Sequence, residues 1–564
     1  MAVSFDIKIF KSKYFWLVLI FAIFILIRLP GLDLSYYQDE RVWPDIGSAG
    51  IQGLGGFLHP PLTSLIFIAA VKIFGADNLR YLPFLFSIVN FWLLFLLVRS
   101  RFSLKTAFWS VLFFSAGFYS VLASLMIDTD GQVLPFFFLL SVISYYKWRD
   151  GAGLKTKLIW GIALAIFILL GFLTKVSFII AFGAIALDFL YSQKHLLSRR
   201  KLIKTISVAA GLLASFLFLI LAIMYILPNS DVLRPLNYWK HFVVFSGRNY
   251  LQISIQFFKV LLYASPLLLA PLLFLTKDLA RKLRLFIIFL ILGLIFYLAL
   301  FDFSSGALDR YFQFIIMPLS AIAGVAVSNI FERQIVFSYK KYKVLLLGFT
   351  IVLALFFVQF VSHFTPALYP KTEWFSRILS LKWNFLFPFT GGSGPMGFYV
   401  SWLFIASIWL VTIILALAAF VKTNWHKPIW IIILILGFLY NGVFVEEYLF
   451  GKINGSSNSL LKNAVLFIKG NPDIKKVISY NNIGNHELSA IGKFERRLYV
   501  APKHEAAYVD ILQNFQGHYL VIDIPRLHSS SPYVKYFSFC KTIYEENSGK
   551  ISAKVYDCRE IKFN

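Results

Sequence analysis

The sequence predicts an α-helical polytopic membrane protein with a small soluble α/β domain at its C-terminal end. Apolar runs of about 20 residues, long enough to cross the hydrocarbon core of a bilayer, recur up to about residue 446. Lys and Arg are clustered in alternate connecting segments. After about residue 450 the chain becomes polar and carries short β-type runs. We therefore predict a membrane domain at residues 1–447 and a soluble domain at residues 448–564.

The apolar runs predict about thirteen spans, joined by loops whose charges alternate. The spans are expected at about 14–32, 78–98, 106–126 and 131–147, as a pair within 158–191, at 205–227, 255–275, 285–301, 310–333 and 344–361, and in two further runs up to 446. Residues 59–75 are too short for a full crossing after the pair Pro60-Pro61, so we expect a helix in or near the outer interface.

The charge pattern gives an orientation and limits the classes of function. Of the 564 residues 59% are apolar, and the formal charge is +26. The cations lie in short clusters between apolar runs and form no single basic stripe, which argues against a nucleic-acid partner. Positive charge is retained on the cytoplasmic side, so we expect a multi-pass protein of the plasma membrane with its N-terminus inside and its C-terminal domain outside. No cleavable signal peptide is evident in the first apolar run.

The polar C-terminal part has the pattern of a small α/β domain, large enough to hold a core. Strand-like runs occur at 476–480, 518–524 and 551–556, and helical patterns at 458–469 and 504–515. Cys540 and Cys558 are the only cysteines. Disulfides persist in external compartments, so a bridge between them and a pair of unpaired thiols both remain open.

Ionisable residues collect in the loops predicted to face outward. Such groups are costly at a membrane edge unless they face water or have a function. The first loop, residues 33–62, carries carboxylates and a histidine, and later loops add more carboxylates and cations. The set comprises Asp39, Glu40, His59, Asp128, Asp130, Lys175, Lys240, His241, Arg248, Asp309 and Arg310. Carboxylates that can take a proton from an alcohol thus share one face with cations that can hold a phosphate.

Four short motifs in this set resemble the protein O-mannosyltransferases and the related bacterial aminoarabinose transferases. These families are GT-C glycosyltransferases that use polyprenyl- or dolichyl-phosphate sugars as donors. The motifs occur in matching order over most of the membrane part. They are Gln38-Asp39-Glu40-Arg41, His59-Pro60-Pro61-Leu62, Gly171-Phe172-Leu173-Thr174-Lys175, and Asp309-Arg310-Tyr311 with Pro318. The resemblance implies a GT-C fold, and its aminoarabinose branch implies the thirteen-span layout with a soluble outer domain.

The resemblance also implies roles for the acidic residues. Asp39 matches the acidic residue of the first outer loop, which these families use as the catalytic base. Glu40 lies beside it and is expected either to orient the acceptor or a cation, or to cap the loop. Asp128 and Asp130 match the second acidic site, where the alternative is a cap on the next helix.

The donor phosphate is expected to bind cations from several loops. Lys175, Arg248, Arg310 and the adjacent Tyr311 are the candidates. The family pattern has a cation near the His59 box, but Thr63-Ser64 stands there in this sequence, which shifts the expected phosphate contacts to the other loops. His59 then becomes a candidate substrate contact, and the other reading of this side chain is an ordinary interfacial histidine.

Whether a divalent metal assists stays open, and no cofactor is indicated with certainty. His241, His59 and Glu40 are its candidate ligands. The families include sites with a metal and sites without one.

The sequence thus predicts a polyprenyl-phosphate-sugar-dependent glycosyltransferase that acts on an acceptor hydroxyl of a protein, lipid or glycan at the outer face. The expected mechanism is a direct, inverting displacement with Asp39 as general base. Three alternatives remain. A transporter or flippase of lipid-linked sugars would also have many spans. An oligosaccharyltransferase would use a diphosphate donor, but such enzymes carry a WWD motif that this chain lacks. A scaffold for envelope assembly would need no catalytic residue.

Overall fold

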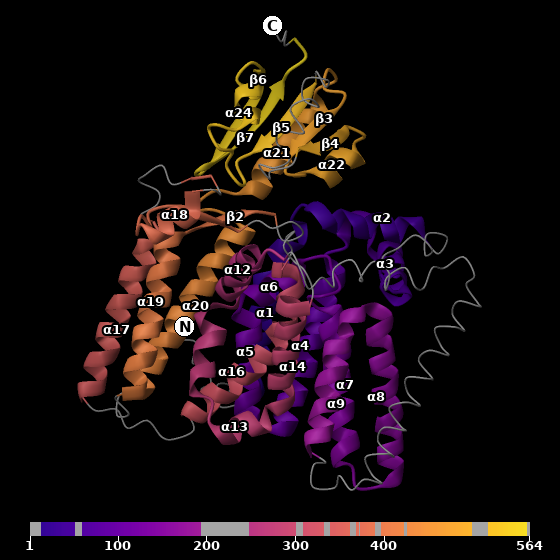
Figure 1. Cartoon of the computed structure of the whole chain (residues 1–564), viewed down its shortest axis with the longest axis vertical. Helices are drawn as coiled ribbons and strands as arrows, with labels where there is room; N and C mark the ends of the chain where they lie inside the picture. The colour runs from indigo at the N-terminus through magenta and orange to yellow at the C-terminus, as the bar shows by residue number, and fades with distance from the viewer. Residues whose placement is uncertain are drawn as a thin grey trace, which may run out of the picture. The chain divides into compact units, whose positions relative to one another are not determined.

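A computed structural model gives the structure of the chain, which is mostly helical (Figure 1). The chain divides into two compact units, described separately below. Unit 1 comprises Met1–Arg28, Val42–Ala264 and Pro271–Arg333, and unit 2 comprises Leu29–Arg41, Ser265–Ala270 and Gln334–Asn564. The residues that the structure describes are 13–50, 59–192, 248–300, 308–331, 339–360, 368–370, 373–389, 396–421, 426–498 and 517–560.

Seven of the described helices are long and apolar enough to cross a membrane, or eight if a bent pair counts as one span. The bent pair is Leu104–Ala116 with Phe118–Leu125, at an angle of 65°. The seven are Tyr14–Asp33, Tyr81–Arg101, Leu154–Thr174, Tyr250–Phe274, Phe312–Phe331, Trp402–Val421 and Lys427–Leu449. Shorter apolar helices lie at Pro61–Phe74, Val176–Ser192, Arg284–Leu300 and Tyr342–Val358. A multi-pass membrane protein is therefore confirmed.

Unit 1 holds most of the membrane helices. Figure 1 shows α7, α8 and α9 side by side in this unit. Its elements are α1 (Lys13–Arg28), α2 (Val42–Ala49), α3 (Pro61–Phe74), α4 (Tyr81–Arg101), α5 (Leu104–Ala116), α6 (Phe118–Leu125), α7 (Val133–Asp150), α8 (Leu154–Thr174), α9 (Ile179–Ser192), α13 (Lys277–Lys282), α14 (Arg284–Ile295), η9 (Phe296–Leu300), α15 (Leu308–Tyr311), η10 (Phe312–Ile315) and α16 (Ile316–Phe331), with the start of α12 (Tyr250–Leu269).

The break between α5 and α6 is stabilised by a buried arginine from α1. The last carbonyls of a helix have no partner within it and need one from elsewhere. Arg28 supplies it, because its Nη1 donates to the Ser115 carbonyl over 3.0 Å and its Nη2 to the Phe114 carbonyl over 3.2 Å. The same guanidinium donates to the hydroxyls of Ser120 and Ser124 on α6. The bend therefore has a built support, and it fixes where the chain goes after α6.

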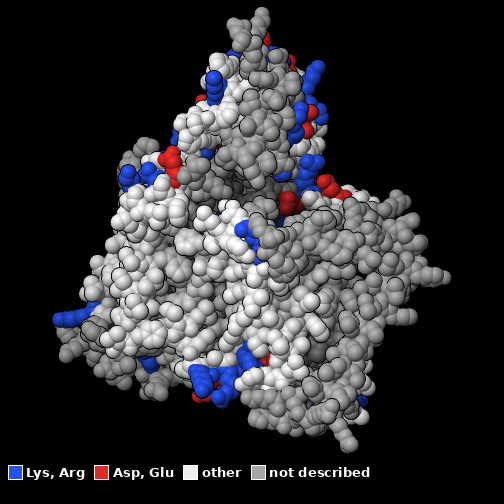
Figure 2. Space-filling view, viewed as in Figure 1, with Lys and Arg blue, Asp and Glu red and all other residues white. Residues whose placement is uncertain are grey.

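A second polar cluster joins α7, α9 and α14. Asp188 is buried and accepts hydrogen bonds from Tyr145 over 2.7 Å and from the Nε of Arg284 over 2.7 Å. Arg149 lies 3.3 Å from the same carboxylate. These cations belong to the segments that the charge pattern assigns to the inside. Figure 2 shows further Lys and Arg over α13, whereas the described faces of the helices beside it carry little charge.

Unit 2 combines membrane helices with the soluble domain. A short antiparallel hairpin pairs Leu386 with Ser401 and Phe389 with Phe398. The elements are η2 (Leu29–Asp33), η3 (Gln38–Arg41), α17 (Tyr339–Val358), α18 (Trp374–Leu379), β1 (Leu386–Phe389), β2 (Phe398–Ser401), α19 (Trp402–Val421), α20 (His426–Leu449), α21 (Ser457–Gly470), β3 (Val477–Tyr480), α22 (Asn485–Ala490), β4 (Phe494–Leu498), β5 (His518–Ile522), α24 (Pro532–Phe537), β6 (Lys541–Ser548) and β7 (Ile551–Asp557).

The soluble domain is built on a five-stranded mixed sheet in the order β4-β3-β5-β7-β6. Strand β3 runs parallel to β4 and β5, and β7 is antiparallel to both β5 and β6. Successive side chains of a strand point to opposite faces. Val477 and Leu520 accordingly belong to one buried cluster and Ile478 and Tyr519 to another. The sheet is thus covered on both faces, which explains why its central strands read as nearly continuous apolar runs.

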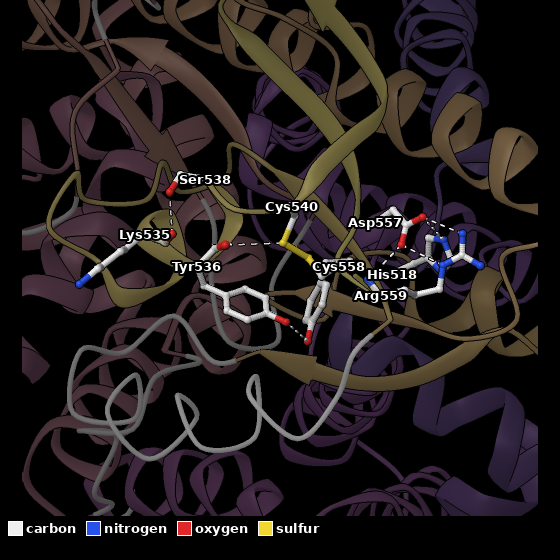
Figure 3. Close-up of a disulfide and its surroundings, with 9 residues drawn as sticks. His518, Lys535, Tyr536, Ser538, Cys540, Asp557, Cys558 and Arg559 are labelled. Atoms are coloured by element: carbon white, nitrogen blue, oxygen red, sulfur yellow. Dashed lines mark hydrogen bonds and ion pairs between the residues drawn. A yellow bond between two sulfur atoms is a disulfide. The ribbon is translucent and has the colours of Figure 1, made fainter. Parts of the chain in front are cut away.

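The structure pairs Cys540 with Cys558, so the bridge, one of the two alternatives left open, is the one formed. Cys558 lies in the buried cluster that α24 covers, and its backbone N–H donates to the Gly517 carbonyl over 2.9 Å. Figure 3 shows the bridge with Tyr536 on one side and the Asp557–Arg559 ion pair on the other.

The predicted fold class is confirmed. Each predicted span in the described part of the chain corresponds to a helix or helix pair, and the predicted short helix at 59–75 is α3. The predicted strands correspond to β3, β5 and β7, and the helix at 458–469 to α21. The span at 205–227 and the helix at 504–515 lie outside the described residues. Strands β4 and β6 and the β1–β2 hairpin were not predicted.

Candidate active site

Asp128 and Asp130 lie in the segment between α6 and α7, and both are only 2% exposed. Asp128 accepts a hydrogen bond from the backbone N–H of Thr129 over 2.5 Å. The segment is tightly packed, since a Cβ on Gly131 would lie 2.7 Å from the Ala123 carbonyl oxygen. The segment therefore holds two carboxylates, two residues apart, in a fixed and largely dry position.

Lys175 forms an ion pair and a hydrogen bond with Asp130. It follows the last residue of α8, and its backbone N–H donates to the Gly171 carbonyl over 3.0 Å. The side chain is 3% exposed, and its Nζ lies 4.4 Å from the ring centroid of Tyr311. A cation at the end of an apolar helix thus turns inward to a carboxylate and an aromatic ring.

Arg310 forms the second ion pair, with its Nε 2.8 Å from Oδ2 of Asp128. It lies on the short helix α15. Its Nη2 also donates to the hydroxyl of Tyr311 over 2.7 Å. Asp128, Asp130 and Lys175, which are buried, and the partly buried Arg310 and Tyr311 thus make one group, which we call the four-charge cluster. With both carboxylates ionised its net charge is zero.

His59 lies at the edge of this cluster and in front of α3. Its ring is 4.9 Å from that of Trp43 on α2. The start of α3 is fixed to the end of α8, because the Thr63 hydroxyl donates to the Thr174 carbonyl over 2.5 Å. Because Thr63 is anchored at Thr174, the residue before Lys175, the His-Pro-Pro-Leu-Thr stretch places His59 near Lys175.

The electrostatics of the cluster separate its two carboxylates. Burial raises the pKa of Asp130 to about 6, with a further rise from Asp128, although Lys175 and Arg310 oppose both. Burial would also raise the pKa of Asp128, but Arg310 and Lys175 outweigh it and hold this pKa below its usual range. Burial, together with Lys175, lowers the pKa of His59 to about 3, so its ring is neutral. Asp130 is accordingly the group whose charge changes near neutral pH.

A small cavity of about 30 Å³ lies beside Asp130. Ser177 and Tyr297 line it together with apolar side chains such as Phe138 and Phe314. Pockets for drug-sized ligands are about ten times larger or more. The cavity has room for about two water molecules, so it suits the hydration of the carboxylate and not the binding of a sugar.

The other predicted site residues lie apart from these contacts or outside the described residues. Arg248 is 7% exposed, donates to the Ala299 carbonyl, and has its guanidinium 5.5 Å from the ring centroid of Tyr250. His241 lies outside the described residues. Within the described part of the chain, no three His, Cys, Asp or Glu side chains converge as a metal site would require.

Asp39 and Glu40 belong to unit 2, where they differ in burial. Glu40 is 3% exposed, and its carboxylate accepts the backbone N–H of Tyr37 over 3.0 Å. Its own N–H donates to the Tyr37 carbonyl over 3.1 Å. Asp39 is exposed. Of two adjacent carboxylates, Glu40 holds a turn and Asp39 is open to solvent.

Two residues of the site were not predicted from the sequence. Thr63 connects α3 to α8, and its only signal was its place after the His-Pro-Pro-Leu box. Tyr297 on η9 lies 6.0 Å from Tyr311 between ring centroids and lines the cavity beside Asp130. An aromatic residue within an apolar run gave no signal, because such residues are common in membrane helices.

The described helices and sheet define a polytopic membrane protein with the GT-C fold, and comparisons with known proteins agree. Residues 58–226, which carry His59, both aspartates and Lys175, match the family of dolichyl-phosphate-mannose-protein mannosyltransferases. The resemblance inferred from the motifs is therefore confirmed over these residues, which hold two of the four motifs. A search of curated protein sequences finds no match.

Several solved structures are similar to this chain. The chain is similar to ArnT from Cupriavidus metallidurans bound to undecaprenyl phosphate, with a TM-score of 0.51 and 13% identity over 96% of this chain and 98% of that chain. For the apo state of that protein the TM-score is 0.49, with 13% identity over 96% of this chain and 97% of that chain. For an oligosaccharyltransferase from Archaeoglobus fulgidus the TM-score is 0.41, with 11% identity over 89% of this chain and 69% of that chain. At such low identity the similarity to the first of these establishes the fold.

Proposed function

We propose that the chain is an integral-membrane glycosyltransferase that moves a sugar from a polyprenyl monophosphate to an acceptor hydroxyl on the outer face of the plasma membrane. The observation that carries the proposal is the four-charge cluster. A buried cation, a partly buried one and two buried carboxylates are costly to desolvate, so a purely structural role is a poor reason to keep them at a membrane edge. The family match over residues 58–226 supports the same donor class.

The cations suit a phosphate whose charge increases during the reaction. A sugar-phosphate diester carries one negative charge, and the phosphate gains a second when the sugar leaves. Lys175 provides a compact charge and Arg310 a planar fork for two oxygens. When Asp130 takes up a proton the cluster has a net charge of +1, which complements the donor phosphate. Arg248 is a further candidate contact.

Asp39 is the proposed general base. It takes the proton of the acceptor hydroxyl as the oxygen attacks the anomeric carbon, and the bond from that carbon to the phosphate oxygen breaks. This single displacement inverts the anomeric configuration. The leaving phosphate is a stable anion, so the second carboxylic acid that glycoside hydrolases use is not needed. The exposure of Asp39 and the capping role of Glu40 favour this choice of base over its neighbour.

The orientation has support in the soluble domain. The Cys540–Cys558 bridge suits an oxidising, external compartment. The cations around Asp188 suit the cytoplasmic ends of α7 and α14. Both agree with an inside N-terminus and an outside C-terminal domain.

The test uses the full-length protein in vesicles with polyprenyl monophosphate donors carrying a hexose or aminoarabinose. We expect Asp39→Asn to lose sugar transfer by about 100-fold or more, because a positioned base contributes about 10²–10⁴ to the rate, while donor binding is retained. Unchanged transfer in Asp39→Asn rules out this base. Movement of the donor across the vesicle with no transfer by the wild type supports a transporter instead. Mass spectrometry of envelope peptides and lipids with and without the gene then identifies the acceptor.

A further inference from the structure

The segment that carries Asp39 is attached to the soluble domain by contacts along its length. We call residues 33–41 the Asp39 segment. The backbone N–H of Ser35 donates to Oδ1 of Asn458 over 2.9 Å. Lys462 on α21 donates to the Asp33 carbonyl over 2.8 Å and forms an ion pair with its carboxylate. The start of the segment is therefore held by the first turns of α21.

The middle of the segment contacts α22. The ring of Tyr36 lies 4.5 Å from that of His486 between centroids. The carboxylate of Glu487 accepts hydrogen bonds from the side chain of Ser35 and the backbone of Tyr36, although burial dominates and raises the pKa of Glu487. A second helix of the soluble domain thus binds the backbone directly ahead of Asp39.

Tyr37 is inserted into the soluble domain. It is 1% exposed and belongs to the apolar cluster that contains Leu461 and Leu520. Its hydroxyl accepts a hydrogen bond from Nδ2 of Asn481 over 2.7 Å. Asn481 directly follows β3 and has a left-handed backbone, with φ of 55°. Ligands of sheets with parallel strands bind at the carboxyl ends of those strands. Here a tyrosine of the same chain contacts that edge.

The other side of Asp39 is fixed as well. The buried carboxylate of Glu40 closes the turn back to Tyr37, and the guanidinium of Arg41 lies 5.5 Å from the ring centroid of Phe494 on β4. Asp39 itself is exposed, between the buried Tyr37 and Glu40. The backbone on both sides of the proposed base is thus held by residues far along the chain.

We propose that the soluble domain positions Asp39 for catalysis, with the Tyr37–Asn481 hydrogen bond as the main positioning contact. The inference rests on the proposed function of Asp39 as base. A base must be held within a fraction of an ångström of its productive place, and its supporting residues provide that precision. Tyr37 and Asn481 are therefore positioning residues, which act on the rate through Asp39 without touching the substrate.

The variants Tyr37→Phe and Asn481→Ala test this in the full-length protein. Each removes one partner of the hydrogen bond, and Tyr37→Phe keeps the ring in the apolar cluster. We expect kcat to fall about tenfold, as misplacement of a reacting group by under 1 Å would cause, with the KM for the donor unchanged. We also expect faster hydrogen exchange in residues 33–41. Tyr536→Phe is the matched control, because it removes a hydroxyl that lies 3.4 Å from that of Tyr519 in the other cluster of the sheet.

The outcomes separate the two proposals. Unchanged kcat in Tyr37→Phe and Asn481→Ala, together with an inactive Asp39→Asn, overturns the positioning role and leaves the base in place. An active Asp39→Asn overturns the base, whatever the other variants do. Equal losses of kcat in Tyr536→Phe would show that the domain acts only through its stability, and would also overturn the positioning role. If hydrogen exchange in residues 33–41 is no faster in Tyr37→Phe and Asn481→Ala than in the wild type, the proposed contact is contradicted. This test does not depend on activity.

Discussion

Lys175 and Asp130 form a buried ion pair across 45 residues of sequence, between the end of α8 and the segment that precedes α7. Each is at most 3% exposed, so neither charge is open to bulk water if the other is removed. Breaking such a pair costs about 3–5 kcal/mol. The pair is therefore a structural contact and, in the proposed function, also a source of positive charge for phosphate.

Two variants separate these roles. Lys175→Gln leaves Asp130 buried without its cation, so we expect lower thermal stability and a fall in transfer of about 100-fold. Lys175→Gln combined with Asp130→Asn replaces the ion pair with neutral amides of similar size, so we expect most of the stability to return while transfer stays low. Thermal unfolding and transfer assays in vesicles measure both. Recovery of transfer in the double variant means that Lys175 has no part in phosphate binding.

Arg310→Lys tests the planar fork. Lysine keeps the charge beside Asp128 but cannot hold two phosphate oxygens at once. We expect the KM for the donor to rise about tenfold, as loss of one charge-assisted hydrogen bond of about 1.5 kcal/mol would cause. Arg284→Lys is the matched control, since Arg284 also pairs with a buried aspartate, Asp188, at 2.7 Å. An equal rise in both variants argues for a general effect on folding.

The pH dependence of donor binding follows from Asp130. Its pKa is raised to about 6, chiefly by burial, so the cluster gains its net positive charge as the pH falls through 6. We expect binding of the donor phosphate to tighten over that range. Asp130→Asn should remove this step. Titration of donor affinity between pH 5 and 8 checks it, and an identical profile in the variant shows that another group is responsible.

The pH dependence of stability has two opposing contributions. The folded-state pKa of Asp130 lies above its ordinary 3.8, so its stabilising contribution is present below that value and is lost as the pH rises through about 6. The folded-state pKa of His59 is about 3, below its ordinary 6.5, so its contribution is present above 6.5 and is lost as the pH falls toward 3. We expect His59→Gln to be less sensitive than wild type to acid between pH 6.5 and 4 in thermal unfolding.

Gly131→Ala tests how tightly the acidic segment is held. The added Cβ would lie 2.7 Å from the backbone oxygen of Ala123 and would also meet the side chain of Gln313. Because a backbone atom cannot move aside easily, we expect the segment to shift, with a loss of stability of about 1–3 kcal/mol and of donor binding. Gly153→Ala is the control, because its Cβ would meet nothing within 4 Å. Wild-type donor binding by Gly131→Ala would show that the segment tolerates a shift.

Periodicity and charge were enough to predict the membrane helices and the central strands, because both depend on local apolar patterns. The pairing of Asp130 with Lys175 and of Asp128 with Arg310 was not predictable, because it depends on how distant helices pack. The edge strands β4 and β6 were missed for a different reason. Their sequences, FERRL and KTIYEENS, are highly charged, and pairing with β3 and β7 compensates for that composition. Likewise, nothing in its neighbours marks Tyr37 as part of a distant core.

The guanidinium of Arg28 has a consequence for how the chain is made. Its partners in α5 and α6 lie 86–96 residues later in the sequence. An arginine costs about 2.5–3.5 kcal/mol on insertion scales at the centre of a lone span and less toward its end, where Arg28 lies. While the first span is the only one in the bilayer, the guanidinium of Arg28 therefore lacks these hydrogen-bond partners. It gains them when the bent pair emerges from the ribosome. Arg28 thus favours early assembly of the first and third predicted spans, before the helices that carry Lys175 and Arg310 have been synthesised.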